Sequence, residues 1–222
     1  MAEPATVQPV EEGPVEEETE FGTLTVRFDR RVLRPRHWTT AQSYWAADLL
    51  ARSPAGPVLE LCAGAGHIGL LAVQREPRHL VMVDSDPVAC AYARRNAAAA
   101  PGPGTTEVRP GRFEEVLGPD ERFVGVIADP PWVATAETGR FPEDPVSAID
   151  GGEDGLDVAW QALETAAGHL TDRGWVLLQL GSTAQTTRLA ARLHESDLGL
   201  RPVEVREYGD RGVLLRLVRL DR

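Results

Sequence analysis

This chain has few cysteines, no long apolar run and no excess of basic residues, and each absence excludes a class of protein. Its two cysteines are Cys62, at the end of an apolar run, and Cys90, within a helical pattern. They provide neither a disulfide framework nor the spacing of a metal site, which favours a reducing compartment. No segment reaches the roughly 18 consecutive apolar residues of a membrane span, and the acidic first residues differ from a secretory leader. We therefore expect a cytoplasmic protein that neither enters a membrane nor is secreted.

Acidic residues outnumber basic ones. The sequence has 34 Asp and Glu against 23 Lys and Arg, which gives a formal net charge of -11 and a pI near 4.9. On average such a surface repels phosphate backbones and anionic lipids. The charge therefore disfavours a nucleic acid as partner, although a local basic patch would override it.

The length of 222 residues suits one well-filled domain. Residues 1–20 contain seven glutamates among several prolines and few apolar side chains, which predicts a disordered acidic tail. Residues 21–222 form the expected domain. Within it, residues 21–56 are an extension of one strand and one helix, and residues 57–222 are the core.

The core repeats a strand-and-helix alternation. Short apolar runs bounded by glycine and proline alternate with longer segments rich in alanine, leucine and arginine. This predicts an α/β fold with a Rossmann-like, doubly wound, mostly parallel sheet of seven strands, whose ligand crevice lies beyond the carboxyl ends of the strands. The last two strands form a C-terminal antiparallel hairpin. The expected strands are residues 58–61, 80–84, 107–109, 124–128, 175–180, 203–207 and 213–220, and the expected core helices are residues 68–75, 87–100, 156–170 and 184–196.

A glycine-rich loop follows the first core strand, in the sequence Glu60-Leu61-Cys62-Ala63-Gly64-Ala65-Gly66-His67-Ile68-Gly69. Its glycines fit the dinucleotide-binding pattern, and Asp84 lies near the distance expected of a ribose-binding acid, so a nicotinamide or flavin enzyme is one interpretation. Glu60 opposes it, because a carboxylate at the mouth of the loop would repel a pyrophosphate. S-adenosylmethionine has no phosphate and carries cationic ammonium and sulfonium groups, so it suits an acidic loop better.

Two plainer interpretations apply to the same segment. The glycines would serve only a tight turn, or Asp84 would only help to start the next helix together with Ser85, Asp86 and Pro87. Of these residues Asp86 is the better helix cap.

A second motif, Asp129-Pro130-Pro131-Trp132, follows the buried run Val124 to Ala128. Asp129 and the Pro130 carbonyl can each accept a hydrogen bond from a flat NH2 group, and Trp132 can stack on its plane. The alternative is an ordinary loop that begins with two prolines. Asp129 and Gly64 would lie on the same edge of the sheet.

With these two motifs the sequence resembles the class I S-adenosylmethionine-dependent methyltransferases of the (Asn/Asp)-Pro-Pro-(Tyr/Phe/Trp) type. Within that type, Ala148-Ile149-Asp150-Gly151-Gly152-Glu153-Asp154-Gly155-Leu156-Asp157 is similar to a loop of the N5-glutamine methyltransferases that modify peptide chain release factors. The segments at residues 32–36 and 178–181 are similar too. The resemblance covers roughly residues 21–219, and the loop at 148–157 is its most specific part.

The resemblance implies a set of site residues. Glu60, Gly64 and Gly66 would contact the methionine part of S-adenosyl-L-methionine, Asp84 would hold the ribose hydroxyls, and Cys62 would also belong to the cofactor site. Asp129 would face both the cofactor and the acceptor, and with Pro130 and Trp132 it would form the catalytic acceptor site. No metal is expected.

The sequence departs from the family pattern at four places. Cys62 replaces the first loop glycine, and Arg112 stands where an acidic residue often meets adenine. Asp129 stands where glutamine-modifying enzymes usually carry Asn, and Asp is commoner in relatives that act on nucleic-acid bases. Where release-factor enzymes have an amino-terminal helical domain, we expect this sequence to have only the acidic tail.

These observations favour an N-methyltransferase that acts on a protein, with a glutamine amide as the first acceptor to consider. An exocyclic amine of RNA or DNA and a catalytically inactive cofactor-binding module remain the alternatives. The five histidines share no spacing and are expected to be surface or structural residues, with His67 set apart by its place beside the loop. Arg34, Arg36 and Trp38 either line the acceptor side or belong to a solvated strand end.

Overall fold

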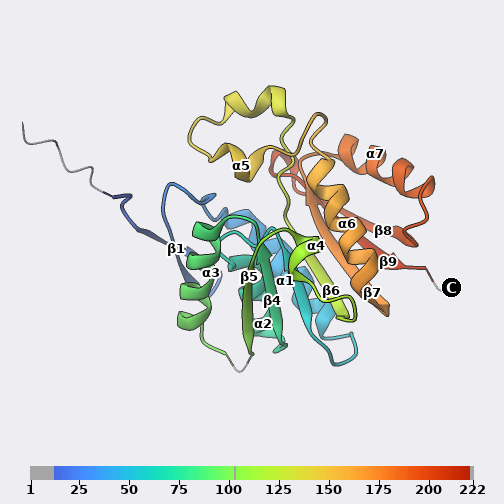
Figure 1. The fold of residues 1–222 in the computed structure, drawn as a ribbon, viewed down its shortest axis with the longest axis horizontal. Coiled ribbons are helices and arrows are strands. Elements are labelled where there is room, and N and C mark those ends of the chain that lie inside the picture. Colours follow the sequence, from blue (N-terminus) through green and yellow to red (C-terminus); the bar gives the residue numbers. More distant parts are fainter. Residues whose placement is uncertain (1–12, 103, 221–222) are drawn as a thin grey trace, which may run out of the picture.

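The computed structural model describes residues 13–102 and 104–220, and it contains two β-sheets, the larger of which has helices on both faces (Figure 1). The larger sheet has seven strands in the order β5-β4-β3-β6-β7-β9-β8. From β5 to β7 neighbouring strands are parallel, and β9 runs antiparallel to both β7 and β8. The predicted fold class is confirmed.

The core elements occur where the apolar pattern placed them, with small shifts at their ends. The strands are β1 (Glu17–Phe21), β2 (Leu24–Phe28), β3 (Val58–Leu61), β4 (Leu80–Asp84), β5 (Thr106–Pro110), β6 (Phe123–Ala128), β7 (Leu170–Leu180), β8 (Leu200–Glu207) and β9 (Val213–Arg219). The longer helices are α1 (Thr40–Leu50), α2 (His67–Arg75), α3 (Pro87–Ala99), α6 (Asp157–His169) and α7 (Thr183–His194). Short helical turns, which the sequence pattern did not reveal, are η1 (His37–Thr39), α4 (Phe113–Val116), η2 (Thr135–Arg140), α5 (Val146–Ile149) and η3 (Gly209–Arg211).

Successive residues of the central strands face opposite helical layers. In β4, Leu80 and Met82 belong to the apolar cluster that contains residues of α1, α2 and α3, whereas Val81 and Val83 belong to the cluster that contains residues of α6 and α7. Burial on both faces explains why these strands are continuous apolar runs in the sequence. The helices cover the two faces of the sheet but not the carboxyl ends of its strands, so polar residues can lie at that edge.

The two-stranded sheet corrects part of the prediction for residues 1–20, because the first four residues of β1 belong to the expected disordered tail. β1 pairs antiparallel with β2. Phe21 at its end is fully buried, and Glu18 forms an ion pair with Arg27 at 2.8 Å. An apolar anchor and a cationic partner on a neighbouring strand hold this acidic segment, and composition alone does not reveal either. Residues 1–12 of the predicted tail lie outside the described residues.

Among the described helices, none is long and apolar enough to cross a membrane.

Candidate active site

Three neighbouring strands bring the predicted site residues to one edge of the sheet. The last residue of β3 is in register with Val83 of β4 on one side and with Ala128 of β6 on the other. Cys62, Asp84 and Asp129 come directly after these three positions and therefore lie close together. The parallel register explains how residues far apart in the sequence form one site.

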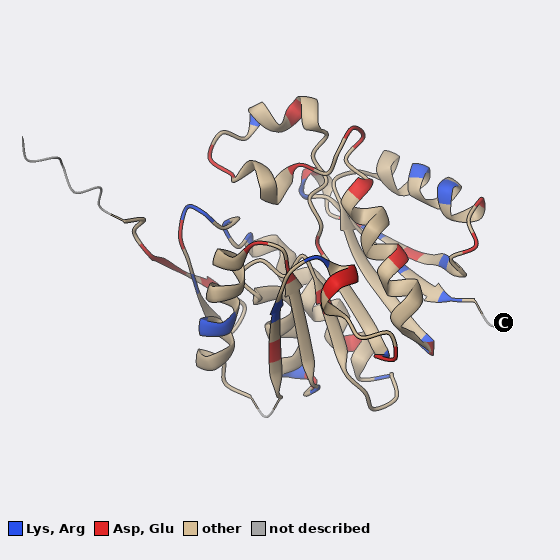
Figure 2. Ribbon diagram, viewed as in Figure 1, with Lys and Arg blue, Asp and Glu red and all other residues tan. Residues whose placement is uncertain are grey.

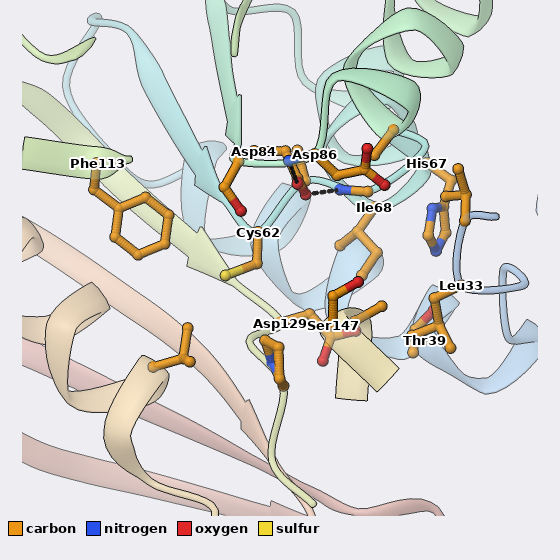
Figure 3. Close-up of a pocket in the computed structure, with 18 of the residues that line it drawn as sticks. Leu33, Thr39, Cys62, His67, Ile68, Asp84, Asp86, Phe113, Asp129 and Ser147 are labelled. Atoms are coloured by element: carbon orange, nitrogen blue, oxygen red, sulfur yellow. Dashed lines mark hydrogen bonds between the residues drawn. The ribbon is translucent and has the colours of Figure 1, made fainter. Parts of the chain in front are cut away.

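A cavity of about 260 Å³ lies against these three residues. Figure 3 shows Cys62, Asp84 and Asp129 between Phe113 on one side and His67 on the other. The chain ahead of α1 and the turn at α5 complete the wall. Further residues that line this cavity include Arg31, Leu33, Arg34, Arg36, Thr39, Gly64, Ile68, Arg112, Glu114, Pro131, Ser147 and Ala148.

Asp84 is held in place by backbone donors. Its Oδ2 accepts a hydrogen bond from the Gly64 amide at 2.7 Å, and its Oδ1 accepts one from the Asp86 amide at 2.9 Å. Burial nevertheless raises the pKa of the Asp84 carboxyl. Asp86 caps α3 through the Val88 amide at 2.8 Å, as expected of the better cap. Asp84 is therefore not needed as the cap of α3 and faces the cavity.

Gly64 and Gly66 of the loop require glycine for different structural reasons. Gly64 has φ +53°, and a Cβ added there would meet no atom within 4 Å, so its backbone is open to a ligand. Gly66 has φ +79°, and a Cβ there would lie 2.9 Å from the Met82 sulfur. Gly66 thus packs the loop onto β4 and is not among the residues that line the cavity.

Glu60 lies behind the loop, which corrects the expectation that it stands at the loop's mouth. The residue is 2% exposed, and its Oε1 accepts a hydrogen bond from the Gly69 amide at 2.9 Å. Burial, with the nearby Asp129 and Asp84, raises the pKa of Glu60 to about 8. Glu60 does not line the cavity. It supports the loop through the Gly69 amide, and it is not in a position to repel a pyrophosphate bound in the cavity.

A second cavity of about 240 Å³ adjoins the first. Asp129, Pro131 and Arg36 line both cavities, whereas Pro130 and Trp132 line only the second. The acceptor motif therefore separates the two spaces. The second cavity also contacts Trp38, Phe141, Asp144, Gln179 and Arg211.

Asp129 stands at the junction without a cationic partner. Among residues 13–102 and 104–220, no group donates a hydrogen bond to its carboxyl group. Burial raises the pKa of Asp129 to about 7. A carboxyl group with free acceptor oxygens and a pKa near neutrality is suited to bind a donor or a cation supplied by a ligand.

Several residues around the site gave no signal in the sequence. Gln42 of α1 is fully buried and donates to the carbonyl of Ala128 at 3.0 Å, directly ahead of Asp129. Arg36 forms an ion pair with Asp144 at 2.6 Å and so joins two segments that close the cavities. Neither pairing follows a helical or strand period, so only the folded chain reveals them.

The structure also places the other side chains that the sequence put near the site. Arg34 lines the first cavity, and Trp38 lines the second. His67 lines the first cavity with its ring edge-on to Phe21, at 4.7 Å between centroids. Burial lowers the pKa of His67 to about 4, so the ring is neutral near pH 7. Within the described part of the chain, no group of His, Cys, Asp and Glu side chains suits a metal ion.

Comparison with known proteins agrees with this geometry. The family model described as Methyltransferase small domain matches residues 43–141. The chain is 36% identical over 169 residues to the release factor glutamine methyltransferase of Geobacter sulfurreducens, which covers 73% of this chain and 57% of that protein. It is 31% identical over 163 residues to the ribosomal protein uL3 glutamine methyltransferase of Bordetella pertussis, which covers 69% of this chain and 53% of that protein.

The chain resembles the class I S-adenosylmethionine-dependent methyltransferases. The solved structure of TYW2 from M. jannaschii in complex with AdoMet superimposes with a TM-score of 0.60 at 13% identity, and the match covers 97% of this chain and 90% of that one. This likeness shows the fold. The chain spans less than two thirds of the length of the curated relatives that it matches. The family resemblance predicted from the two motifs is confirmed.

Proposed function

We propose that the protein is an S-adenosylmethionine-dependent N-methyltransferase whose acceptor is a planar NH2 group, with a glutamine side-chain amide of a protein as the first candidate. The observation that carries the proposal is the junction of two adjoining cavities at the unpaired Asp129. One cavity suits a cofactor and the other suits an acceptor. A protein substrate is supported by relatives named for release factor and for ribosomal protein uL3, and a substrate of that kind would agree with a reaction in the cytoplasm.

The residues of the first cavity fit this cofactor. Gly64 leaves open space for a ligand at the loop, and Asp84 offers carboxylate oxygens to ribose hydroxyls. Phe113, which is 8% exposed, offers an apolar surface for a base. Arg112 is held by an ion pair with Glu114 at 2.6 Å, so it does not present an unpaired cation to the site. When bound, S-adenosylmethionine supplies a methyl group made electrophilic by the attached sulfonium.

The residues of the second cavity suit an amide acceptor. An amide NH2 is a weak nucleophile because its lone pair is delocalised. The Asp129 carboxylate and the Pro130 carbonyl would each accept one N–H bond, which favours a pyramidal nitrogen and directs its lone pair toward the first cavity. Trp132 would stack on the acceptor plane. Orientation of this kind contributes on the order of 7 to 11 kcal/mol in well-aligned reactions, so no strong base is required.

Asp129 favours one alternative, an exocyclic amine of RNA or DNA, because a carboxylate accepts from an aryl NH2 as readily as from an amide. The net charge opposes it. A cofactor-binding module without catalysis is the third candidate, and the intact Asp129-Pro130-Pro131-Trp132 motif opposes that one.

Labelling an extract tests the function. The protein is incubated with radiolabelled methyl donor and whole-cell extract, and the product is digested with protease or nuclease. We expect protease-sensitive, nuclease-resistant label that disappears with Asp129→Ala, while calorimetry shows that this variant still binds the cofactor. Asp129→Asn keeps an acceptor oxygen and should retain partial activity.

Cofactor identity is tested in the same calorimeter. S-adenosylmethionine or its demethylated product should bind, NAD should not compete, and Asp84→Ala should weaken binding by about 1 to 3 kcal/mol through lost charged hydrogen bonds. Tight NAD binding would contradict the proposal.

A further inference from the structure

The loop at residues 151–155 lies within the segment 148–157, the most specific part of the family resemblance, and it packs against the acceptor motif. The Gly151 amide donates to the Val133 carbonyl at 2.8 Å. A Cβ at Gly151 would lie 2.5 Å from the Pro131 carbonyl oxygen, and one at Gly155 would lie 2.3 Å from that of Trp132. Only glycine allows the two backbones to approach this closely.

Gln185, in the first turn of α7, joins this loop to the acceptor motif. Its side chain is buried, with the residue 6% exposed. Nε2 donates to the Trp132 carbonyl at 2.8 Å and lies 3.3 Å from that of Gly155, while Oε1 accepts from the Gly181 amide at 2.9 Å. One amide group thus connects three segments, the acceptor motif, the glycine loop and the end of β7.

Gly181 restrains the Trp132 ring. A Cβ at Gly181 would lie 2.3 Å from Cε3 of that ring, so the ring rests against bare backbone. The carbonyl of Trp132 is held by Gln185 and its ring by Gly181, and both restraints come from the junction of β7 and α7. The position of the aromatic plate is therefore determined outside the Asp129-Pro130-Pro131-Trp132 sequence itself.

We propose that Gln185 is a positioning residue for the acceptor site, which fixes Trp132 through its carbonyl group and thereby sets the plane on which the acceptor NH2 group stacks. This rests on the proposed function, because it assigns Trp132 to the acceptor. Gln185 touches neither cavity and acts only through Trp132 and the glycine loop. Without the donor, the partly buried Trp132 carbonyl loses its hydrogen bond, and the ring gains freedom to leave its place.

Two variants separate the donor from the rest of the side chain. Gln185→Met keeps the length of the side chain and removes all of its hydrogen bonds. Gln185→Glu keeps the acceptor for the Gly181 amide but, as the carboxylate favoured at pH 8, lacks the donor to Trp132. Gln74→Leu, on α2 and away from both cavities, is the control for loss of a glutamine.

The first readout needs no methyl transfer. The five tryptophans are replaced by 5-fluorotryptophan, and the fluorine resonance of Trp132 is assigned with Trp132→Phe. We expect Gln185→Met and Gln185→Glu to shift or broaden the Trp132 resonance and to leave that of Trp45 unchanged. Gln74→Leu should leave both unchanged. A Trp132 resonance that stays the same in both Gln185 variants overturns the proposal.

The second readout is label transfer to the extract at saturating S-adenosylmethionine. Misplacement of a reacting group by about 1 Å costs roughly a hundredfold, so both Gln185 variants should lose between about tenfold and a hundredfold in turnover while the Kd for the cofactor stays near wild type. If Gln185→Glu transfers label at the wild-type rate, the donor has no positioning role. If the wild-type protein labels nothing, the proposed function fails, and the fluorine spectra alone decide whether Gln185 fixes Trp132.

Discussion

At the scale of single residues, the site depends on three acids at or near the carboxyl ends of parallel strands, of which Glu60 is buried and Asp84 and Asp129 are partly buried. Burial raises the pKa of Asp129 to about 7 and that of Glu60 to about 8, and it raises that of Asp84 as well. A cationic ligand would compensate for the charge that burial disfavours. The free protein is therefore expected to be less stable near neutral pH than a protein without these acids, and more receptive to a cation.

The first prediction is a change in the pH dependence of stability for Asp129→Asn. The folded pKa of Asp129, about 7, is above its ordinary value of 3.8, so the proton stabilises the folded state. Stability from this group is fully present below pH 4 and is lost as the pH rises toward 7. Asn does not titrate, so the free energy of unfolding of the variant should rise relative to that of the wild type as the pH rises from 4 through 7. The relative gain should be about 2 to 4 kcal/mol, and it should stay constant once the carboxyl group is fully ionised.

Urea unfolding at pH values from 4 to 8 measures this difference. The same substitution at the exposed Asp172 is the control, and its stability curve should run parallel to that of the wild type. A gap between Asp129→Asn and wild type that does not change with pH would contradict the assignment.

The second prediction concerns Cys62, which has φ +56° in a position where the family usually carries glycine. A left-handed conformation costs a residue with a Cβ roughly 1 to 2 kcal/mol, while glycine loses more freedom on folding. The variants Cys62→Gly and Cys62→Ala both lack the thiol, so they differ only in the Cβ that alanine keeps. The glycine variant should be more stable than the alanine variant by about 0.5 to 1 kcal/mol in urea unfolding. Equal stabilities would mean that Cys62 is not strained.

At the scale of secondary-structure elements, the sequence predicted what periodicity can encode. β3 and β4 have the predicted bounds, because strands buried on both faces appear as apolar runs that end at polar residues. β1 was not predicted, because its stability comes from Phe21 and from side chains of other elements. The expected position of Glu60 at the mouth of the loop was wrong for the same reason, because the sequence pattern does not reveal that its partner is the amide of Gly69. The site was thus predictable at strand ends and not in the side-chain network behind them.

The third prediction concerns the attachment of the β1–β2 sheet, which shares no strand pairing with the larger sheet. Asn96 of α3 accepts from the Arg27 amide at 2.9 Å and donates to the carbonyls of Arg27 at 3.0 Å and Ala65 at 2.9 Å. It therefore joins β2, α3 and the glycine loop. Asn96→Ala leaves buried backbone groups without partners and should destabilise the fold by about 2 to 4 kcal/mol.

Hydrogen exchange shows whether that loss is local. In Asn96→Ala the amides of β2 should lose more protection than the fall in global stability explains. The amides of β7, which Asn96 does not contact, should lose only as much protection as the fall in global stability explains. Equally faster exchange in both strands would show that Asn96 stabilises the domain as a whole and does not specifically attach the β1–β2 sheet.

At the scale of the whole molecule, basic side chains are dispersed among acidic ones. Figure 2 shows arginines on α7 and along the segment that follows β2, with acidic residues at β1 and α4. Arg34 and Arg36, which line the cavities, and Arg140 of η2 are already paired with carboxylates. Arg34 pairs with Glu17 at 3.2 Å, Arg36 with Asp144 at 2.6 Å and Arg140 with Glu137 at 3.2 Å. A phosphate backbone would have to replace these carboxylates, in addition to approaching a chain with a net charge of -11.

The last prediction follows from this pairing and separates a protein substrate from a nucleic acid. A protein that neutralises phosphates loses affinity steeply as salt rises, because binding releases condensed counterions. We expect no detectable binding of random RNA at physiological salt, and no steep salt dependence at lower concentrations, in fluorescence anisotropy with the full chain. A variant that lacks residues 1–12 removes three glutamates while leaving β1 in place, and it should behave in the same way because Arg34, Arg36 and Arg140 keep their partners. RNA binding by the truncated protein with a steep salt slope, together with nuclease-sensitive label, would replace the protein acceptor with a nucleic-acid base.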